Sequence, residues 1–418
     1  TNRRGAIVAI DPTTGGILAF VSTPAYNPNL FVTGIDHKSY NALNQSLDRP
    51  LFNRTIQGQY PPGSTIKPFV GLAGLDYEVT SWDFSILDPG FYRLDNDRHQ
   101  YRDWKKWGHG KVNLVTAIRQ SCDTFFYDMS YKLGIDNLHD FMAPFGFGRK
   151  TDIDIGNEQT GLLPSKAWKR RRYDLPWFPG ETLIAGIGQG FMLATPLQLA
   201  VATANLANRG HLIKPKLAST QSRTKEEHRS VDTPKLEKDN LQNNELKTGT
   251  ENQVSDDMSD NVIAHESKSI LGQTDSGEKR TLENVTLSEE ENWQLMFDAM
   301  ESVVHHPKGT ARKIGIDSKY RIAGKTGTAQ VLGIKQDEAY DAEKIDERYR
   351  DHALFIGFAP ADNPQIAVAV IVENGGGGGS TAAPIARIVM DSYLHNTWQK
   401  EHTQKEIKED AVASVKNQ

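Results

Sequence analysis

This 418-residue sequence has a single cysteine, no excess of positive over negative charge and no long apolar run, and each of these features excludes a class of protein. The single cysteine, Cys122, excludes an internal disulfide framework. The formal net charge of -5 leaves no basic surplus, so we expect no nucleic-acid partner. No uninterrupted apolar run reaches the roughly 20 residues that cross a bilayer, and no signal-peptide pattern is present. The sequence opens directly on a strand-like run over 6–10, as a piece of a longer protein would.

The remaining composition is that of an ordinary globular protein. A hydrophobic share of 38% and a charged share of 24% allow a sizeable core, in one large domain or two of usual size. The apolar spacing predicts strands over 6–22, 353–359 and 366–373, and helices over 65–75, 112–133, 195–209, 293–304 and 383–394. This order predicts an α+β fold, in which both ends of the chain build one antiparallel sheet with helices packed on it.

One long segment, residues 218–290, lacks the composition of a packed structure. It contains no Phe, Trp or Tyr and is crowded with charged and small polar residues. Such a segment cannot bury enough apolar surface to offset the entropy of ordering it. We interpret it as a flexible polar insertion within one domain over 1–398, which a polar tail over 399–418 follows.

Three short motifs suggest nucleophilic catalysis, and the first is the Ser-x-x-Lys pattern of Ser64 and Lys67. On a helix, residues three apart share a face, so the lysine amine can reach the serine hydroxyl. A serine hydroxyl is a poor nucleophile until a base takes its proton, and a neutral lysine can do so. The helix N-terminus also supplies free N–H groups where an oxyanion forms. The other two motifs are Ser121-Cys122-Asp123 and Lys325-Thr326-Gly327-Thr328.

All three motif types occur a second time, inside the polar insertion. The copies are Ser222-Arg223-Thr224-Lys225, Lys247-Thr248-Gly249-Thr250 and Ser259-Asp260-Asn261. No apolar periodicity flanks these copies, so nothing there would hold side chains within the roughly 0.5 Å that a catalytic site requires. Ser64, by contrast, follows a Pro-Pro-Gly break and begins an amphipathic helix. We therefore assign the site to the motifs at 64, 121 and 325.

The order of the motifs marks the penicillin-binding proteins and serine β-lactamases. Four longer strings narrow the resemblance: YPPGSTIKP over 60–68, YRDWKKWGHG over 101–110, GIGQG over 186–190 and ATPLQ over 194–198. They are similar to those of the penicillin-binding protein 2 family, the class B transpeptidases of rod-shape elongation. The resemblance covers residues 5–395 apart from the insertion. It implies the penicillin-binding protein/serine β-lactamase-like transpeptidase fold, whose antiparallel sheet of about five strands is flanked by helices.

The resemblance also implies the activity of a peptidoglycan DD-transpeptidase, which cross-links stem peptides through a Ser64 acyl-enzyme during cell elongation and is inhibited by β-lactams. In this role Lys67 accepts the serine proton, Ser121 relays a proton to the leaving D-alanine, and Asp123 holds Lys67. Lys325 supplies a positive electrostatic field. The substrate is bound by Thr326, Gly327 and Thr328. Asp123 stands where most of the wider family has Asn, so it accepts hydrogen bonds and cannot donate them.

Two other activities remain open on the same fold. A serine β-lactamase or DD-carboxypeptidase would use the same nucleophile with water as the acceptor, and a β-lactam sensor would be acylated without catalysis. For the transpeptidase, the resemblance implies stem peptides, β-lactams and a RodA-type glycosyltransferase as partners, and no cofactor for catalysis. It also implies a periplasmic domain of an inner-membrane-anchored protein, with the anchor absent from this chain.

A structural metal is a further hypothesis, because Cys122 lies inside the second motif and Asp88, Asp103 and His109 lie upstream of it. Cysteine, histidine and carboxylates are zinc ligands, and four of them close a tetrahedral structural site. Their spacing matches no zinc-finger pattern, so a buried thiol, a satisfied histidine and turn-capping aspartates remain the alternative. The polar excursion over 82–110 needs something to order it, which favours zinc. Such a metal would leave no position open for catalysis.

Overall fold

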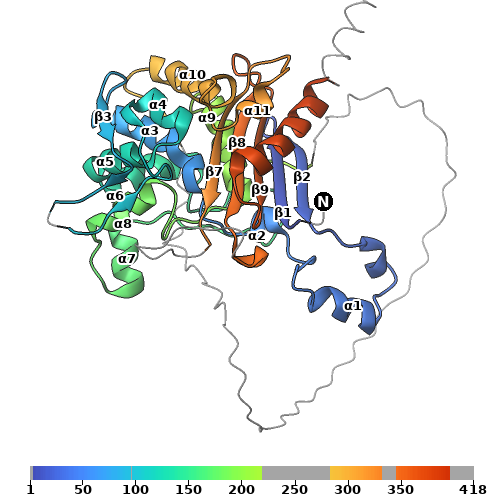
Figure 1. Cartoon of the computed structure of the whole chain (residues 1–418). Helices are drawn as coiled ribbons and strands as arrows, with labels where there is room; N and C mark the ends of the chain where they lie inside the picture. The colour runs from blue at the N-terminus through green and yellow to red at the C-terminus, as the bar shows by residue number, and fades with distance from the viewer. Residues whose placement is uncertain (1–2, 96, 219–282, 332–344, 396–418) are drawn as a thin grey trace, which may run out of the picture. The chain divides into compact units, whose positions relative to one another are not determined.

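The computed structural model describes residues 3–95, 97–218, 283–331 and 345–395. Its centre is a five-stranded antiparallel sheet with strand order β2-β1-β9-β8-β7. The strands are β1 (Gly5–Ile10), β2 (Ile17–Thr23), β7 (Ala323–Ala329), β8 (His352–Ala359) and β9 (Ile366–Val372). The two ends of the chain therefore meet in one sheet, as predicted, and β7 forms one of its edges (Figure 1).

Helices cover the sheet because its central strands are apolar on both faces. Every residue of β9, with the sequence IAVAVIV, is buried. The helix α9 (Pro196–Ala207) packs against β1, β8 and β9, and α10 (Glu291–His305) packs against β7. A helix over 378–395 passes in front of the sheet in Figure 1 and buries Met390. The burial of both faces accounts for the strands being continuous apolar runs, without alternation.

A helical region lies beside β7 and carries two of the three motifs (Figure 1). Its first part is a 3-10 turn η2 (Gly63–Ile66) that leads into α3 (Lys67–Asp76). The predicted helix over 112–133 is wrong as one element, because it is two: α4 (Leu114–Gln120) and α5 (Asp123–Leu133). Ser121 between them has a φ of 59°, a left-handed conformation that no helix can continue through.

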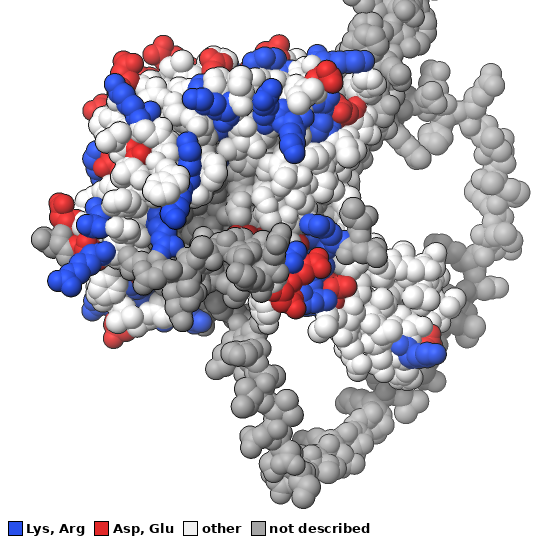
Figure 2. Space-filling model, in the orientation of Figure 1, with Lys and Arg blue, Asp and Glu red and all other residues white. Residues whose placement is uncertain are grey.

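The polar excursion over 82–110 is ordered as two small ribbons. In one, β3 (Ser85–Asp88) pairs with β6 (Gly110–Asn113), and in the other, β4 (Phe91–Tyr92) pairs with β5 (Tyr101–Arg102). The remaining elements are η1 (Pro28–Phe31), α1 (His37–Asn44), α2 (Arg54–Gln57), α6 (Ile135–Met142), η3 (Ala143–Phe145), α7 (Lys166–Tyr173), α8 (Pro179–Gly186), α11 (Arg312–Gly315) and η4 (Glu347–Tyr349). On the face drawn in Figure 2, basic and acidic side chains are interspersed over the helical region.

The predicted insertion begins where the description of the structure ends, but its far boundary differs. Residues 219–282 and the predicted tail over 399–418 lie outside the described residues. The amide of Val285, however, donates to the carbonyl of Gly210 at 2.9 Å, and that of Ser288 donates to Asp76 at 2.8 Å. The end of the insertion predicted at 290 is therefore too late in the chain. No helix in the described ranges is long and apolar enough to cross a membrane.

Candidate active site

Ser64 lies in the 3-10 turn beside the edge strand β7, and it is partly exposed while its neighbours Gly63 and Thr65 are buried. Gly63 has a φ of 54°, and a Cβ there would lie 2.6 Å from the carbonyl oxygen of Thr328. Its amide donates to the carbonyl of Gly188 at 2.8 Å. Only glycine fits this turn, because both the conformation and the close approach exclude a side chain. The Pro-Pro-Gly break therefore brings the serine against β7.

The ammonium of Lys67 is the central charge of the site, and its side chain is fully buried. Its Nζ lies 2.6 Å from Oδ1 of Asp123, 2.9 Å from the carbonyl oxygen of Ser121 and 3.4 Å from the Ser121 hydroxyl. The ring of Phe126 lies beneath it, with its centroid 5.2 Å from Nζ. Because a buried charge is stable only when it is paired and hydrogen-bonded, these contacts fix the position of the lysine.

Ser121 joins the two lysines of the site. Its hydroxyl accepts a hydrogen bond from Nζ of Lys325 at 2.8 Å and makes a longer contact with Nζ of Lys67 at 3.4 Å. The left-handed conformation of Ser121 allows its carbonyl and its hydroxyl to face Lys67 together. A proton can therefore pass between the lysines through a single hydroxyl.

Lys325 is completely buried in β7, and its Nζ donates to the carbonyl of Thr326 at 3.0 Å as well as to Ser121. Burial lowers the pKa of Lys325 well below its usual range, and the neighbouring charge of Lys67 lowers it further, against the opposing effect of Asp123. The site thus contains two buried lysines, and the pKa of Lys325 is lowered by its surroundings.

The third motif lines the edge of β7 next to Ser64. Thr328 is exposed, whereas Gly327 lies so close to the serine turn that a Cβ would meet Cγ2 of Thr65 at 2.7 Å. The hydroxyl of Thr326 lies 2.8 Å from the hydroxyl of Thr310. The structure therefore brings all eight predicted catalytic and substrate-binding residues together, although they come from three distant segments.

Two further polar contacts at this edge were not predicted from the sequence. Thr310, between α10 and α11, has no motif that would identify it, and its role depends on its contact with Thr326. Gln189 donates from Nε2 to the carbonyl of Thr328 at 2.9 Å. Gln189 belongs to the string GIGQG, whose glycines could have indicated a tight approach to the serine turn.

The four predicted metal ligands also converge, behind the start of α5. One ligand atom from each of Asp88, Asp103, His109 and Cys122 lies within 4.8 Å of the others. Nδ1 of His109 is 2.7 Å from Oδ2 of Asp88, while its Nε2 is buried without a hydrogen-bond partner among the described residues. Burial, and then the charges of Asp103 and Asp88, raise the pKa of the Cys122 thiol. A cation would reverse these unfavourable effects, so the donor set fits a metal such as zinc.

This cluster is bonded directly to the catalytic motif. Oδ2 of Asp103 accepts hydrogen bonds from the amides of Asp123 at 2.6 Å and Thr124 at 3.1 Å. It therefore caps the N-terminus of α5, whose own N-cap residue, Cys122, makes no capping hydrogen bond from its side chain. Oδ2 of Asp123 in turn accepts from the amide of Trp104 at 3.2 Å. The cluster and the excursion together position the carboxylate that holds Lys67.

A partly exposed serine at a helix start, a buried lysine three residues later, a bridging serine and a lysine on an adjacent edge strand are typical of the active-serine acyltransferases. Comparison with known families gives the particular one: the penicillin binding protein transpeptidase domain matches residues 5–275 and 263–391. The chain belongs to this family, and the predicted fold and resemblance are confirmed.

Relatives with curated names agree with this assignment. The chain is 45% identical over 393 residues to the peptidoglycan D,D-transpeptidase MrdA of Acinetobacter baumannii, covering 94% of this chain and 51% of the relative. It is 41% identical to MrdA of Escherichia coli K12, covering 89% of this chain and 51% of the relative. The chain thus spans about half the length of the curated relatives that it matches.

Solved structures are similar over almost the whole chain. The complex of Pseudomonas aeruginosa PBP2 with WCK 5153 matches with a TM-score of 0.74 and 47% identity, covering 94% of this chain and 71% of that one. The complex of Helicobacter pylori PBP2 with MreC matches with a TM-score of 0.73 and 31% identity, covering 94% and 60%. These likenesses confirm the sheet and its flanking helices as the fold of the family.

The lowered pKa of Lys325 predicts a dependence of stability on pH. Between its lowered pKa and the usual lysine value, the unfolded chain binds more protons than the folded one, so the free energy of unfolding rises with pH. Lys325→Met removes this effect. We expect the difference in free energy of unfolding, parent minus variant, to increase between pH 7 and 10, by up to about 1.4 kcal/mol per pH unit.

Urea unfolding of both proteins across this pH range measures the difference. Lys132→Met, at an exposed lysine on α5, controls for the loss of one positive charge. A constant difference between the parent and Lys325→Met would contradict the lowered pKa of Lys325.

Proposed function

We propose that this chain carries the active site of a peptidoglycan DD-transpeptidase, which cross-links stem peptides during cell elongation. The observation that supports this function best is the arrangement of Lys67, which is buried between Asp123 and Ser121 one helical turn from the partly exposed Ser64. β7 is an edge strand of the sheet and lies beside Ser64, so it suits an extended peptide added as a further strand.

The first step is the attack of Ser64 on the carbonyl carbon of the penultimate D-alanine. For this step Lys67 acts in its deprotonated form, in which its two remaining N–H groups donate to Asp123 and to the carbonyl of Ser121, and its lone pair takes the serine proton. The bond between Oγ and the carbonyl carbon forms, and the carbonyl becomes an oxyanion. The backbone N–H groups of Ser64 and Thr328 stabilise it, at typically about 3–4 kcal/mol per donor.

The second step expels the terminal D-alanine. The carbon–nitrogen bond breaks, and the leaving amine takes the proton of the Ser121 hydroxyl, which Lys67 or Lys325 replaces at 3.4 Å or 2.8 Å. Before it leaves, the D-alanine carboxylate is bound by the hydroxyls of Thr326 and Thr328 near Lys325. An amine of a second stem peptide then attacks the ester carbonyl and gives a proton to Lys67. The new C–N bond forms the cross-link, the C–Oγ bond breaks, and Oγ of Ser64 takes the proton back from Lys67.

A hydrolytic function is less consistent with the carboxylate at this site. Deacylation by water requires a base that is free to activate it. The two oxygens of Asp123 accept hydrogen bonds from Lys67 and from the amide of Trp104. Asp123 therefore holds the lysine and is not placed to activate water, which favours a transpeptidase over a β-lactamase.

The setting of the enzyme is also part of the proposal. We place this chain as the periplasmic domain of an inner-membrane-anchored protein, working beside a RodA-type glycosyltransferase. One structural neighbour, 29% identical with a TM-score of 0.69, is described as a peptidoglycan synthase complex that coordinates polymerization and crosslinking. Another is the complex of PBP2 with MreC. These relatives make an assembly of the same kind a reasonable expectation.

The mass of the intact protein after incubation with a penicillin tests the nucleophile. We expect one covalent adduct on the parent, none on Ser64→Ala, and an undiminished adduct on Ser222→Ala, in which the rival motif of the insertion is removed. The adduct should persist, because the carboxylate of Asp123 is bonded to Lys67 and to the amide of Trp104 and is not placed to activate water. An adduct that survives Ser64→Ala would refute the assignment, and rapid release of hydrolysed drug would instead support a β-lactamase.

We also propose that Asp88, Asp103, His109 and Cys122 hold a structural zinc ion. Four such ligands form a closed tetrahedral site, which binds no substrate and provides rigidity. The buried, unpartnered Nε2 of His109 and the concentration of acidic groups support this proposal. Because Asp103 also caps α5, we expect the metal to stabilise the position of Asp123 and through it that of Lys67.

Metal analysis of the purified parent tests this second proposal. We expect one zinc per chain, and its removal by a strong chelator should lower Tm by several degrees, at roughly 2–4 °C per kcal/mol. Cys122→Ser and Asp88→Asn should lose zinc, whereas Asp174→Asn, at an exposed aspartate, should keep it. A parent without bound zinc, under conditions that supply it, would refute the proposal.

A further inference from the structure

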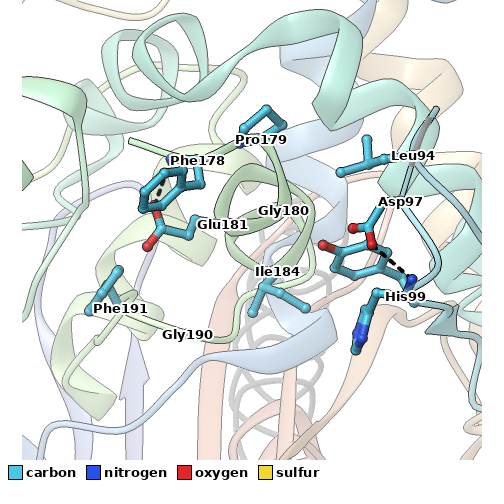
Figure 3. Close-up of a pocket in the computed structure, with 11 residues that line it drawn as sticks. Leu94, Asp97, His99, Phe178, Pro179, Gly180, Glu181, Ile184, Gly190 and Phe191 are labelled. Atoms are coloured by element: carbon cyan, nitrogen blue, oxygen red, sulfur yellow. Dashed lines mark hydrogen bonds between the residues drawn. The ribbon is translucent and has the colours of Figure 1, made fainter. Parts of the chain in front are cut away.

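A cavity of about 720 Å³ lies between the excursion over 82–110 and α8, and the mechanism above does not use it. One wall comes from the excursion, with Leu94, Asp97 and Tyr101. The opposite wall comes from α8 and the segment after it, with Ile184 and Phe191 (Figure 3). Its volume falls in the range of pockets that bind small molecules or side chains, about 300–1,000 Å³.

Both walls continue directly into the catalytic site. The wall that ends at Tyr101 is followed by Asp103 and Trp104, whose carboxylate and amide bind Asp123. The other wall includes Gly190, which follows Gly188 and Gln189, and these two bond to Gly63 and Thr328 on either side of the serine turn. The cavity is therefore bounded by one segment that continues to Asp123 and by another that continues to the serine turn.

The cavity has two carboxylates, Glu181 and Asp97, and they differ in whether they are free to bind a cationic ligand. Both oxygens of Glu181 bind Nζ of Lys169, at 2.5 and 2.6 Å, and one of them also accepts from the amide of Phe178. The charge of Glu181 is thus neutralised by a buried lysine. Asp97 accepts a hydrogen bond from the amide of His99 at 2.8 Å, which is a neutral donor, and it forms no ion pair with any residue that the structure describes (Figure 3).

The cavity therefore combines an apolar interior with one carboxylate at its wall that has no cationic partner in the described part of the chain. Leu94, Ile184 and Phe191 offer surface for methylene groups, and Figure 3 shows Asp97 and Leu94 on the side opposite to Phe191. The ligand that fits this combination is an aliphatic chain that ends in an ammonium group. Stem peptides that supply an amine for cross-linking carry such a side chain.

We propose that this cavity is a subsite for the amine-bearing aliphatic side chain of the donor stem peptide, with Asp97 as the partner of its ammonium group. The inference rests on the proposed transpeptidase function and adds the side-chain specificity of the same site. It places Asp97 as a specificity-determining residue.

The chemistry of Asp97 favours the donor over the acceptor. A carboxylate next to an amine stabilises the ammonium form, and an ammonium group has no lone pair with which to attack an ester. An amine held by Asp97 is therefore recognised and does not react. The donor side chain needs only to be recognised, whereas the acceptor amine must lose its proton at Ser64.

Two matched penicillins test the proposal, because the acyl side chain of a penicillin takes the place of the residue that precedes D-Ala-D-Ala. Both carry the same straight-chain acyl group, which ends in a primary amine in one and in its N-acetyl derivative in the other. Their acylation rate constants at Ser64 are measured by competition with a fluorescent penicillin. We expect the parent to react about three- to fivefold faster with the free amine, the range of a partly exposed ion pair.

Variants of one aspartate then locate the preference. Asp97→Asn should bring the ratio of the two rate constants to about one, and Asp95→Asn, at an exposed neighbour, should leave the ratio at its parental value. The ratio within each protein cancels any general change in the reactivity of Ser64. Equal rates in the parent, or a preference that survives in Asp97→Asn, would overturn the proposal.

The failure of the proposed function gives a different result. If benzylpenicillin also failed to acylate the parent, the transpeptidase assignment itself would fall, and the subsite with it. If the free amine instead shortened the lifetime of an acyl-enzyme already formed, without speeding its formation, the cavity would serve the acceptor and the donor assignment would be wrong.

Discussion

The buried ion pair between Lys67 and Asp123 is the interaction on which the rest of the site depends. An ammonium group that is fully removed from water requires a carboxylate and further acceptors at fixed positions. Asp123 and the carbonyl of Ser121 meet this requirement only because the chain breaks between α4 and α5. Burial lowers the pKa of Lys325, and the charge of Lys67 lowers it further while that of Asp123 opposes the change, so the pair influences both lysines.

The carboxylate of Asp123 is itself positioned by hydrogen bonds from neighbouring segments. Asp103 caps α5 at Asp123, the amide of Trp104 binds the second oxygen of Asp123, and both residues belong to the ordered excursion. The proposed zinc ligands and one wall of the proposed subsite belong to the same excursion. A polar segment without a large core of its own thus links structural support, catalysis and specificity, which explains why its order matters for function.

Much of this arrangement could be predicted from the sequence, because chemistry restricts which residues can occur in it. Ser64, Lys67 and Lys325 lie in motifs with apolar flanks, and continuous apolar runs predicted the central strands. The break at Ser121 was missed, because apolar spacing continues across it and a single left-handed residue leaves no periodic signal. Thr310 and the cavity wall depend on contacts between distant segments, which no local pattern reveals.

The most direct test of the central claim is a double-mutant cycle of penicillin acylation with Lys67→Ala, Asp123→Ala and the double variant. If Asp123 acts by holding Lys67, its removal has no further effect once the lysine is gone, and the double variant should match Lys67→Ala within about threefold. If the two single losses instead multiply in the double variant, Asp123 acts independently of Lys67, and the buried ion pair is not the basis of the site.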